Sequence, residues 1–302
     1  MKILLFGKGG QVGWELQRSL APLGEVIALD HDSRVYCGDF TDLEGLAQTV
    51  RSVEPDMIVN AAAHTAVDRA ESEAELARTI NALAPGVLAH EAKDLDAWLV
   101  HYSTDYVFDG SGEKPWVEDD ATGPLNVYGA TKLEGERLIR QSGCKHLVFR
   151  TSWVYGARGG NFAKTMLRLA QERDSLNVID DQHGAPTGAD LLADVTAHAI
   201  RTAQKQPEVA GLYHLVAAGE TTWHGYASFV IDFARRNGVA LKVAADAVNP
   251  VQTSTFLTPA KRPHNSRMDT AKLQNAFGLR LPCWKSGVER MLSEVLERSL
   301  AG

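Results

Sequence analysis

The segment GKGGQVG at residues 7–13 constrains the fold more than any other part of the sequence. It directly follows the apolar run KILLF (2–6), and a helical pattern of apolar residues comes after it. Its glycines are spaced G-x-x-G-x-x-G, as Gly7, Gly10 and Gly13. Gly7 permits a tight exit from a strand, Gly10 lets backbone approach a pyrophosphate, and Gly13 lets a helix pack closely on the strand. We therefore expect a dinucleotide-binding turn whose helix N-terminus faces the phosphates.

Short apolar runs alternate with longer amphipathic stretches in the first half of the chain. The runs lie at 2–6, 26–29, 56–60, 98–103 and 146–150. They contain almost no alternating polar residues, which is typical of strands buried on both faces. This order predicts an α/β fold with a doubly wound parallel sheet of the Rossmann type.

The pattern becomes less regular after residue 150. Helices are expected at 161–173, 188–204, 222–237, 269–277 and 285–299, with short strands at 176–179 and 212–216. We expect a dinucleotide-binding domain over 1–150, to which segments at roughly 175–215 return. The rest of 151–302 is expected to form a smaller, mixed α/β substrate-binding domain.

The composition excludes several classes of protein. The chain has 31 basic and 38 acidic residues, and the basic ones are scattered, so no nucleic-acid surface is expected. No run of 18 uncharged apolar residues exists, so no membrane span is expected. The three cysteines offer neither a disulfide framework nor a metal spacing, which favours a cytoplasmic location.

Two acidic residues are candidates for contacts with the adenosine half of a dinucleotide. Asp30 ends the second apolar run, where a carboxylate accepts hydrogen bonds from ribose hydroxyls. Its charge repels a 2′-phosphate, but His31 and Arg34 lie close in the sequence and offset that charge, so the choice between NADH and NADPH stays open. Asp39 is suited to the adenine amino group or, equally, to the start of a helix.

Tyr128 and Lys132 are the candidate catalytic pair. They lie four residues apart at the start of a helical pattern and so share one face. A nearby ammonium lowers the pKa of a phenol, which can then protonate a carbonyl oxygen as hydride arrives at the carbon. In the segment HYSTDYVF (101–108) the apolar run of the strand stops at the polar residues Thr104 and Asp105. This places them at the sheet edge where ligands of such folds bind.

Several motifs together resemble the extended short-chain dehydrogenase/reductases. These are the glycine turn, NAAAHTAVDRAE (60–71), STDYVFDG (103–110), YGATKLEGE (128–136), RTSWVYG (150–156), DQHGAPT (181–187) and RPHNSRMD (262–269). In order and spacing they are similar to the dTDP-4-dehydrorhamnose reductase family over almost the whole chain. The resemblance implies NAD(P)H-dependent reduction of the C4 ketone of dTDP-6-deoxy-L-lyxo-4-hexulose to dTDP-L-rhamnose, for cell-envelope and O-antigen polysaccharides.

The resemblance also implies roles for individual residues. Tyr128 would be the proton donor, Lys132 its partner, and Thr104 the hydroxyl that tunes it. Thr104, Asp105 and Trp153 would contact the sugar, although a core tryptophan is the alternative for Trp153. The residues implied to line the dinucleotide are Gly7, Gly10, Gln11, Val12, Gly13, Asp30, Asp39, Phe40, Ala62, Ala63, His64, Thr65, Tyr102, Tyr128 and Lys132.

Some relatives are implied to be homodimers that bind Mg²⁺ at acidic clusters. Glu15, Asp190 and Glu289 are the candidates here, with solvated helix acids as the alternative. Two other functions stay open. One is a dinucleotide-binding regulatory subunit without catalysis, which the intact Tyr128–Lys132 pair disfavours. The other is a sugar-nucleotide epimerase or dehydratase, and the dehydratase is disfavoured because Tyr106, and no Glu, follows Asp105.

Overall fold

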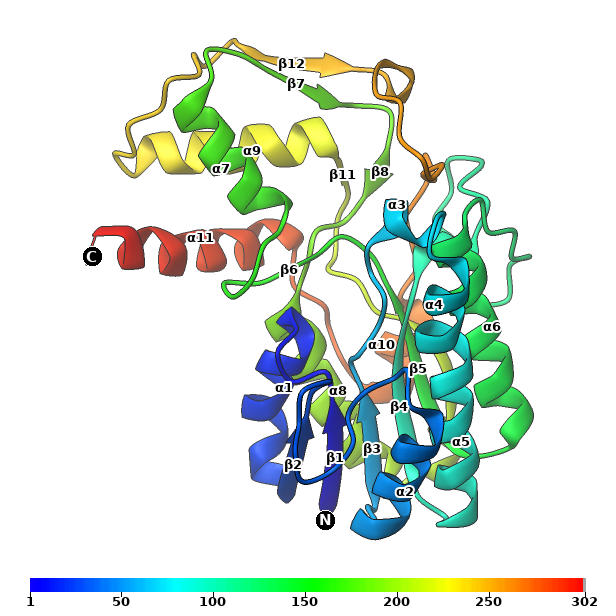
Figure 1. Cartoon of the computed structure of the whole chain (residues 1–302). Helices are drawn as coiled ribbons and strands as arrows, with labels where there is room; N and C mark the ends of the chain where they lie inside the picture. The colour runs from blue at the N-terminus through cyan, green and yellow to red at the C-terminus, as the bar shows by residue number, and fades with distance from the viewer. Residues whose placement is uncertain (301–302) are drawn as a thin grey trace.

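The computed structural model describes residues 1–300 of the chain. Within that range, a six-stranded parallel sheet forms the lower part of the molecule in Figure 1, with strand order β10-β5-β4-β3-β1-β2. The strands are β1 (Lys2–Phe6), β2 (Glu25–Leu29), β3 (Met57–Asn60), β4 (Trp98–Thr104), β5 (Lys145–Thr151) and β10 (Gly211–His214). The expected doubly wound Rossmann-type sheet is confirmed.

Helices cover both faces of this sheet. One face carries α1 (Gln11–Leu20), α8 (Ala189–Ala203) and α10 (Ala271–Phe277), and the other carries α2 (Leu43–Val53), α5 (Ala84–Asp94) and α6 (Val127–Ser142). Short α3 (Val67–Ala70) and α4 (Ala74–Arg78) precede a π-helical turn at Thr79–Leu83, which leads into α5.

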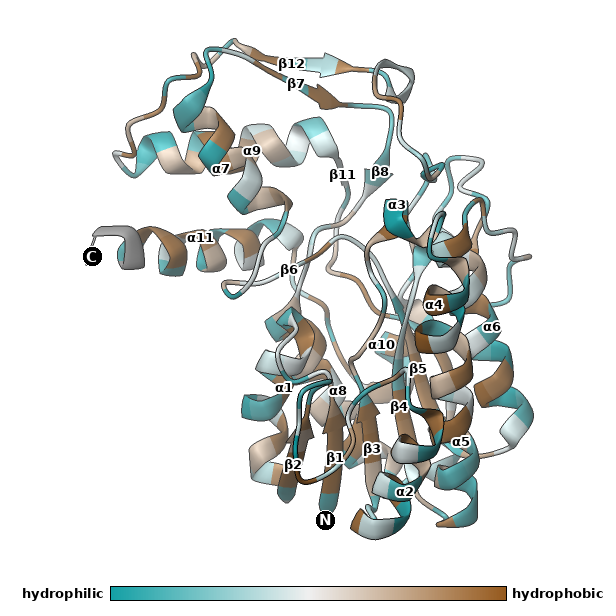
Figure 2. Cartoon of the chain, viewed as in Figure 1, coloured by the Kyte–Doolittle hydropathy of each residue, from teal (hydrophilic) through white to brown (hydrophobic). Residues whose placement is uncertain are grey.

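Successive side chains along each strand point to opposite faces of the sheet and so pack into two different hydrophobic cores. Ile3 and Leu5 pack with α1 and α8, whereas Leu4 and Phe6 pack with α2 and α5. All four are fully buried. Figure 2 shows the strands as a brown layer between helices whose outer faces are teal. The continuous apolar runs of the sequence follow directly from this two-sided burial.

A smaller unit lies above the carboxyl ends of the strands in Figure 1. It contains α7 (Phe162–Glu172), α9 (Trp223–Arg236), α11 (Trp284–Leu300), β7 (Leu176–Ile179) and β12 (Val248–Val251), which pack around a core of their own. Short paired strands join the two units: β6 (Val154–Tyr155) with β9 (Thr187–Gly188), and β8 (His183–Gly184) with β11 (Thr221–Thr222).

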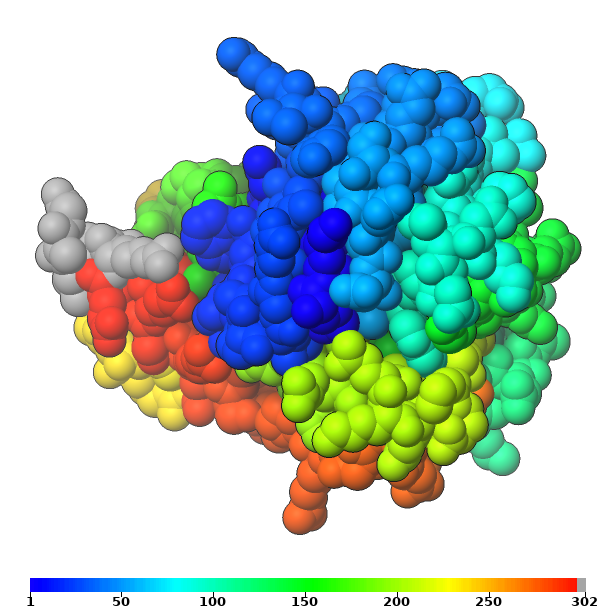
Figure 3. All heavy atoms as spheres, turned by 90° about the horizontal axis from the view of Figure 1, so that it is seen from below, coloured from blue at the N-terminus to red at the C-terminus, as the bar shows by residue number. Residues whose placement is uncertain are grey.

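The returning segment is shorter than the expected 175–215. Residues 189–214 return to the large sheet, where α8 packs on one face and β10 is the edge strand. Leu176–Ile179 instead pairs in parallel with β12 of the smaller unit. Apolar pattern identifies a strand but not its partner. Figure 3 shows yellow-green atoms of the returning segment directly beside the dark-blue N-terminus, where Gln204 contacts Met1. No helix among residues 1–300 is both long enough and apolar enough to span a membrane.

Candidate active site

The expected site residues converge at one edge of the large sheet. Gly7 follows β1, Ala61 follows β3, and Thr104 and Thr151 end β4 and β5. These strands are parallel and in close register, with Phe6 beside Asn60 and Thr104 beside Thr151. Their carboxyl ends therefore lie together and face the smaller unit, which is where open α/β sheets bind ligands.

The glycine turn has the geometry that a bound pyrophosphate needs. Gly7 has a φ of +82°, which favours glycine, and a Cβ at Gly13 would lie 1.9 Å from the Gly7 carbonyl oxygen. Gly10 is the N-cap of α1, and no side chain caps that helix. The first N–H groups of α1 are thus available to an anion, so the turn fits the phosphates of a dinucleotide.

Asp30 lies directly after β2 and contacts the turn. Its Oδ2 accepts a hydrogen bond from the Gly9 N–H at 3.0 Å, and its Oδ1 accepts one from the His31 N–H at 3.0 Å. The carboxylate is held beside the turn, in the position expected of a group that receives ribose hydroxyls. It also orders the loop, which the sequence pattern did not indicate.

The other residues expected to line the dinucleotide differ in what they contact. Gln11 Oε1 accepts a hydrogen bond from Asn161 Nδ2 at 3.2 Å, whereas Val12 packs against the core. Asp39 accepts two hydrogen bonds from Thr41 and thus orders the start of the α2 segment. Phe40 is buried edge-on against Phe6, so its ring belongs to the core.

The Asn-Ala-Ala segment after β3 is fixed through its backbone. Asn60 Oδ1 accepts a hydrogen bond from the Ala62 N–H at 3.0 Å. His64 donates its N–H to Asn81 Oδ1 at 2.9 Å, and its Nε2 lies 3.1 Å from Glu73. Ala63 is half-buried and Thr65 is exposed. Small side chains thus leave this backbone open beside the glycine turn.

Tyr128 lies in the first turn of α6, and Asn126 fixes where that helix begins. The Asn126 Oδ1 accepts a hydrogen bond from the Gly129 N–H at 2.8 Å. The Tyr128 side chain is half-buried and lies beside Thr104, which ends β4. Burial raises the pKa of Tyr128 to about 12, the polar Thr104 hydroxyl opposes that rise, and the charge of Asp105 adds to it.

Lys132 is buried one turn further along α6. Its Nζ donates to the Tyr102 carbonyl at 2.5 Å and lies 3.3 Å from His101 Nε2. Burial lowers the pKa of Lys132 to about 8. Burial, Thr104 and Asp105 set the pKa of Tyr128 in this structure, and the expected lowering of that pKa by the Lys132 ammonium stays a prediction. Tyr102 meets the site through its carbonyl, since its phenol bonds to Thr196 at 2.6 Å.

Asp105 is almost fully buried beside Thr104. It accepts hydrogen bonds from Thr104 and Ser266, yet burial still raises the pKa of Asp105 to about 6. Its Oδ2 is buried and has no hydrogen-bond partner among the described residues. The carboxyl group thus retains the capacity for one further polar partner beside the Thr104 hydroxyl.

Trp153 has a left-handed backbone, with a φ of +50°. Its ring stacks on that of Trp223 at a centroid distance of 3.8 Å, and Gly184 leaves room for it, because a Cβ there would lie 2.8 Å from the Trp153 ring. The ring is half-buried. Strained backbone and a stacked pair fix the flat surface that a sugar contact at Trp153 would require.

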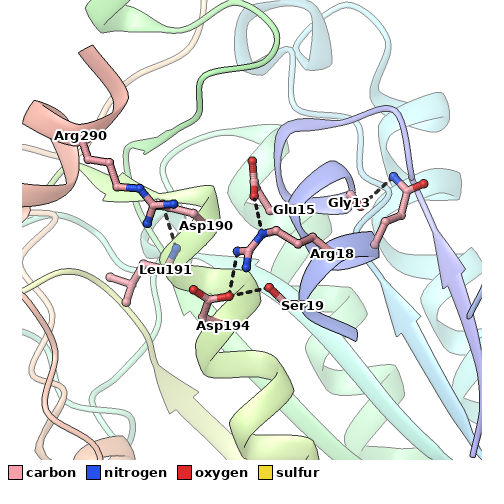
Figure 4. Close-up of polar contacts among 9 residues, drawn as sticks. Gly13, Glu15, Arg18, Ser19, Asp190, Leu191, Asp194 and Arg290 are labelled. Atoms are coloured by element: carbon pink, nitrogen blue, oxygen red, sulfur yellow. Dashed lines mark hydrogen bonds and ion pairs between the residues drawn. The ribbon is translucent and has the colours of Figure 1, made fainter. Parts of the chain in front are cut away.

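The expected metal site finds no support. Glu15 Oε2 accepts from Arg18, which also reaches Asp194 at 2.9 Å, and Asp190 pairs with Arg290 at 3.3 Å (Figure 4). Glu289 is exposed on α11. No group of three or more His, Cys, Asp or Glu side chains within the described chain is placed to hold a metal. Glu15 and Asp190 are thus paired with arginines, and Glu289 does not join them in one cluster.

Sequence reasoning missed the polar groups behind the site. His101 and Asn60 lie under Lys132, and Glu136 on α6 forms an ion pair with Arg150 of β5. The available signal was a titratable residue inside an otherwise apolar strand, as at His101 and Arg150, because such residues are buried only with partners. Trp223 was also missed, since apolar pattern does not reveal which aromatic rings stack.

Comparisons with known proteins agree with this geometry. Residues 1–297 match the family model described as RmlD substrate binding domain. The chain is 62% identical to dTDP-4-dehydrorhamnose reductase of Shigella flexneri over 98% of both chains. It is also similar to the structure of a dTDP-4-dehydrorhamnose reductase from Clostridium acetobutylicum, with a TM-score of 0.87 and 34% identity over 98% and 100% of the two chains. The Bacillus anthracis enzyme, solved in complex with NADP, gives a TM-score of 0.87 and 34% identity over 97% and 99%.

Proposed function

This chain belongs to the dTDP-4-dehydrorhamnose reductase family. On that premise we propose which residues carry out the reduction of the C4 ketone of dTDP-6-deoxy-L-lyxo-4-hexulose to dTDP-L-rhamnose with NAD(P)H. When bound, the reduced nicotinamide supplies the hydride that goes to C4. The protein must bind both ligands side by side, exclude water, and deliver a proton to the C4 oxygen.

Tyr128 donates that proton, and the observation that carries this proposal is its place in the first turn of α6, beside the Thr104 hydroxyl and one turn from the buried Lys132. Tyr128 and Thr104 lie at the carboxyl end of β4, on the same edge of the sheet as the glycine turn. A raised pKa keeps the phenol protonated at neutral pH, as reduction requires. The Thr104 hydroxyl stabilises the phenolate that remains, and the Lys132 ammonium, one turn along α6, does the same when it carries its proton.

The remaining residues hold the two ligands. The α1 N-terminus binds the pyrophosphate, and the Asp30 carboxylate receives the adenosine ribose hydroxyls. Asp105 binds the sugar through its free oxygen, and Trp153 supplies a flat apolar surface beside the pyranose ring. The site thus offers charged or polar contacts to the phosphates and to C4, and an aromatic surface to the sugar ring.

Two alternative functions have weaker support. A regulatory subunit without catalysis does not need a phenol beside the Thr104 hydroxyl and a buried lysine one turn along the same helix. A dehydratase needs an acid–base carboxylate that exchanges protons with substrate. Among the described residues, Asp105 is the only carboxylate whose charge acts on Tyr128, and the residue after it is Tyr106 and not a glutamate.

A spectrophotometric assay tests the proposal. The protein is mixed with enzymatically generated dTDP-4-keto-6-deoxyhexulose and either NADPH or NADH, and nicotinamide absorbance is followed. Loss of absorbance with formation of dTDP-L-rhamnose is expected. Dinucleotide binding without turnover would favour the regulatory subunit, and a product without net oxidation of the nucleotide would favour an epimerase.

Three finer expectations remain predictions. They are a homodimer, the use of NADPH or NADH with the preference between them still open, and a cytoplasmic location. The three free cysteines Cys37, Cys144 and Cys283 support the last of these. Sedimentation velocity tests the first, and parallel kinetics with the two dinucleotides tests the second.

A further inference from the structure

A chain of three buried polar side chains lies beneath the site. Asn60 ends β3, His101 is its register neighbour on β4, and Lys132 reaches His101 from α6. Asn60 Nδ2 lies 3.0 Å from His101 Nδ1, and His101 Nε2 lies 3.3 Å from Lys132 Nζ. Each side chain is 2% exposed or less. In such a buried row of side chains every hydrogen-bond donor must face an acceptor, because no water is available to bond to a group left without a partner.

The donor and acceptor roles follow from the Asn60 end of the chain. Its Oδ1 already accepts the Ala62 N–H, so its Nδ2 group faces the imidazole. His101 Nδ1 must therefore accept a hydrogen bond from Asn60. Burial holds the pKa of His101 well below its ordinary value, so the ring is neutral and carries one hydrogen. That hydrogen is on Nε2, the atom that faces Lys132.

An Nε2–H group facing Lys132 favours one protonation state of the lysine. An ammonium has only donors, so it would oppose the Nε2–H hydrogen, whereas a neutral amine accepts from it. From this geometry we infer that His101, fixed by Asn60, is a positioning residue that disfavours the Lys132 ammonium and so sets the pH above which reduction slows. The inference rests on the proposed roles of Tyr128 and Lys132.

The other groups around the amine act on the same equilibrium. On α6 itself, the charge of Glu136 favours the ammonium and raises the pKa of Lys132, but Glu136 is already paired with Arg150 of β5. From β4, the Tyr102 carbonyl accepts from Nζ in either state. Burial outweighs Glu136 and leaves the pKa of Lys132 at about 8. His101 thus acts on a group that titrates within reach of physiological pH.

NMR tests the inference without turnover. The ¹⁵N resonances of the His101 ring, assigned by their loss in His101→Gln, are expected to show hydrogen on Nε2 and a bare Nδ1 between pH 6 and 9. The ¹³Cε resonance of Lys132, assigned by its loss in Lys132→Met, is expected to titrate near pH 8 in the wild type and at least about one pH unit higher in His101→Gln. Hydrogen on Nδ1, or an unchanged Lys132 titration, would overturn the inference.

Kinetics then connects the lysine to the reaction. The fall in kcat above pH 8 is expected to move to higher pH in both His101→Gln, whose amide oxygen can accept from an ammonium, and His101→Phe, which removes the opposing hydrogen. His146→Gln, on the neighbouring β5, is the matched control and should leave the profile in place. A lower kcat with an unmoved profile in both His101 variants would mean that the role is merely structural. If the NMR titration shifts but the kinetic profile does not, the inference about His101 holds and the proposed role of Lys132 fails.

Discussion

Glu136 and Arg150 form a two-pronged ion pair inside the fold. Arg150 Nε donates to Glu136 Oε1 at 2.9 Å and its Nη2 donates to Oε2 at 2.7 Å, and the side chains are 3% and 2% exposed for Arg150 and Glu136. Ser103 also donates to Oε1, at 2.5 Å. The pair joins α6, which carries Tyr128 and Lys132, to β5 of the sheet. It therefore fixes, from behind, the helix that carries the proposed proton donor.

Glu136→Gln should destabilise the protein by about 3 kcal/mol, because it leaves the Arg150 charge buried without a counter-charge. Glu134→Gln is a matched control on the same helix, since Glu134 pairs with Arg78 but both side chains are partly exposed. That change should cost less than about 1 kcal/mol. Urea unfolding of the three proteins measures both values. Equal losses in the two variants would contradict the importance of burial.

Tyr128→Phe should lower kcat roughly 10³-fold and leave dinucleotide affinity nearly unchanged, because only the proton donor is removed. Stopped-flow absorbance gives kcat, and quenching of tryptophan fluorescence gives affinity. Tyr213→Phe, which loses a buried phenol hydrogen bond to the Val209 carbonyl far from the site, serves as the control. Near wild-type turnover in Tyr128→Phe would rule out the proposed acid.

The two helix-side glycines of the turn should respond differently to alanine. Gly13→Ala places a Cβ against the Gly7 carbonyl and should destabilise the fold by about 2 kcal/mol. At Gly10 the Cβ would meet nothing closer than 3.5 Å, so Gly10→Ala should cost less than about 1 kcal/mol. It should nevertheless weaken dinucleotide binding, because the methyl group occupies the approach to the pyrophosphate. Calorimetric titration of Gly10→Ala with unchanged affinity would place the pyrophosphate elsewhere.

Asp105 should make stability depend on pH in an unusual direction for a carboxyl group. Its pKa is raised in the folded protein to about 6 from an ordinary 3.8. Between those values the folded state holds a proton that the unfolded chain has released, so stability falls as pH rises from about 4 to 6. The loss is up to about 3 kcal/mol. Asp105→Asn lacks this titration, so its stability relative to wild type should rise by that amount between pH 4 and 7 in urea unfolding. A constant difference would show that Asp105 is ionised throughout.

Asp30→Asn should shift cofactor preference toward NADPH by roughly fivefold, because it removes the charge that repels a 2′-phosphate, an effect of roughly 1 kcal/mol. Asparagine keeps an oxygen that can accept the Gly9 N–H, so the turn stays ordered. The ratio of kcat/KM for NADPH and NADH is the measurement. If the ratio does not change, the carboxylate does not face the adenosine ribose.

The sequence by itself determined the sheet, the turn and where the proposed reacting groups lie along the chain. A strand that is buried on both faces requires a continuous apolar run, and a turn that approaches phosphate requires glycines at a fixed spacing. Both features can therefore be recognised in the sequence alone. Tyr128 and Thr104 were predictable for the same reason, since one begins a helix and the other ends a strand.

Only the tertiary structure decided strand partners, burial and charge. Leu176–Ile179 reads as a strand but pairs with β12 in the smaller unit, because pairing depends on contacts far along the chain. Two of the three expected metal ligands, Glu15 and Asp190, pair with arginines instead, which no local pattern shows. Most importantly, the pKa of Tyr128 rises and that of Lys132 falls, because withdrawal from water acts on each charge and depends on everything packed around it.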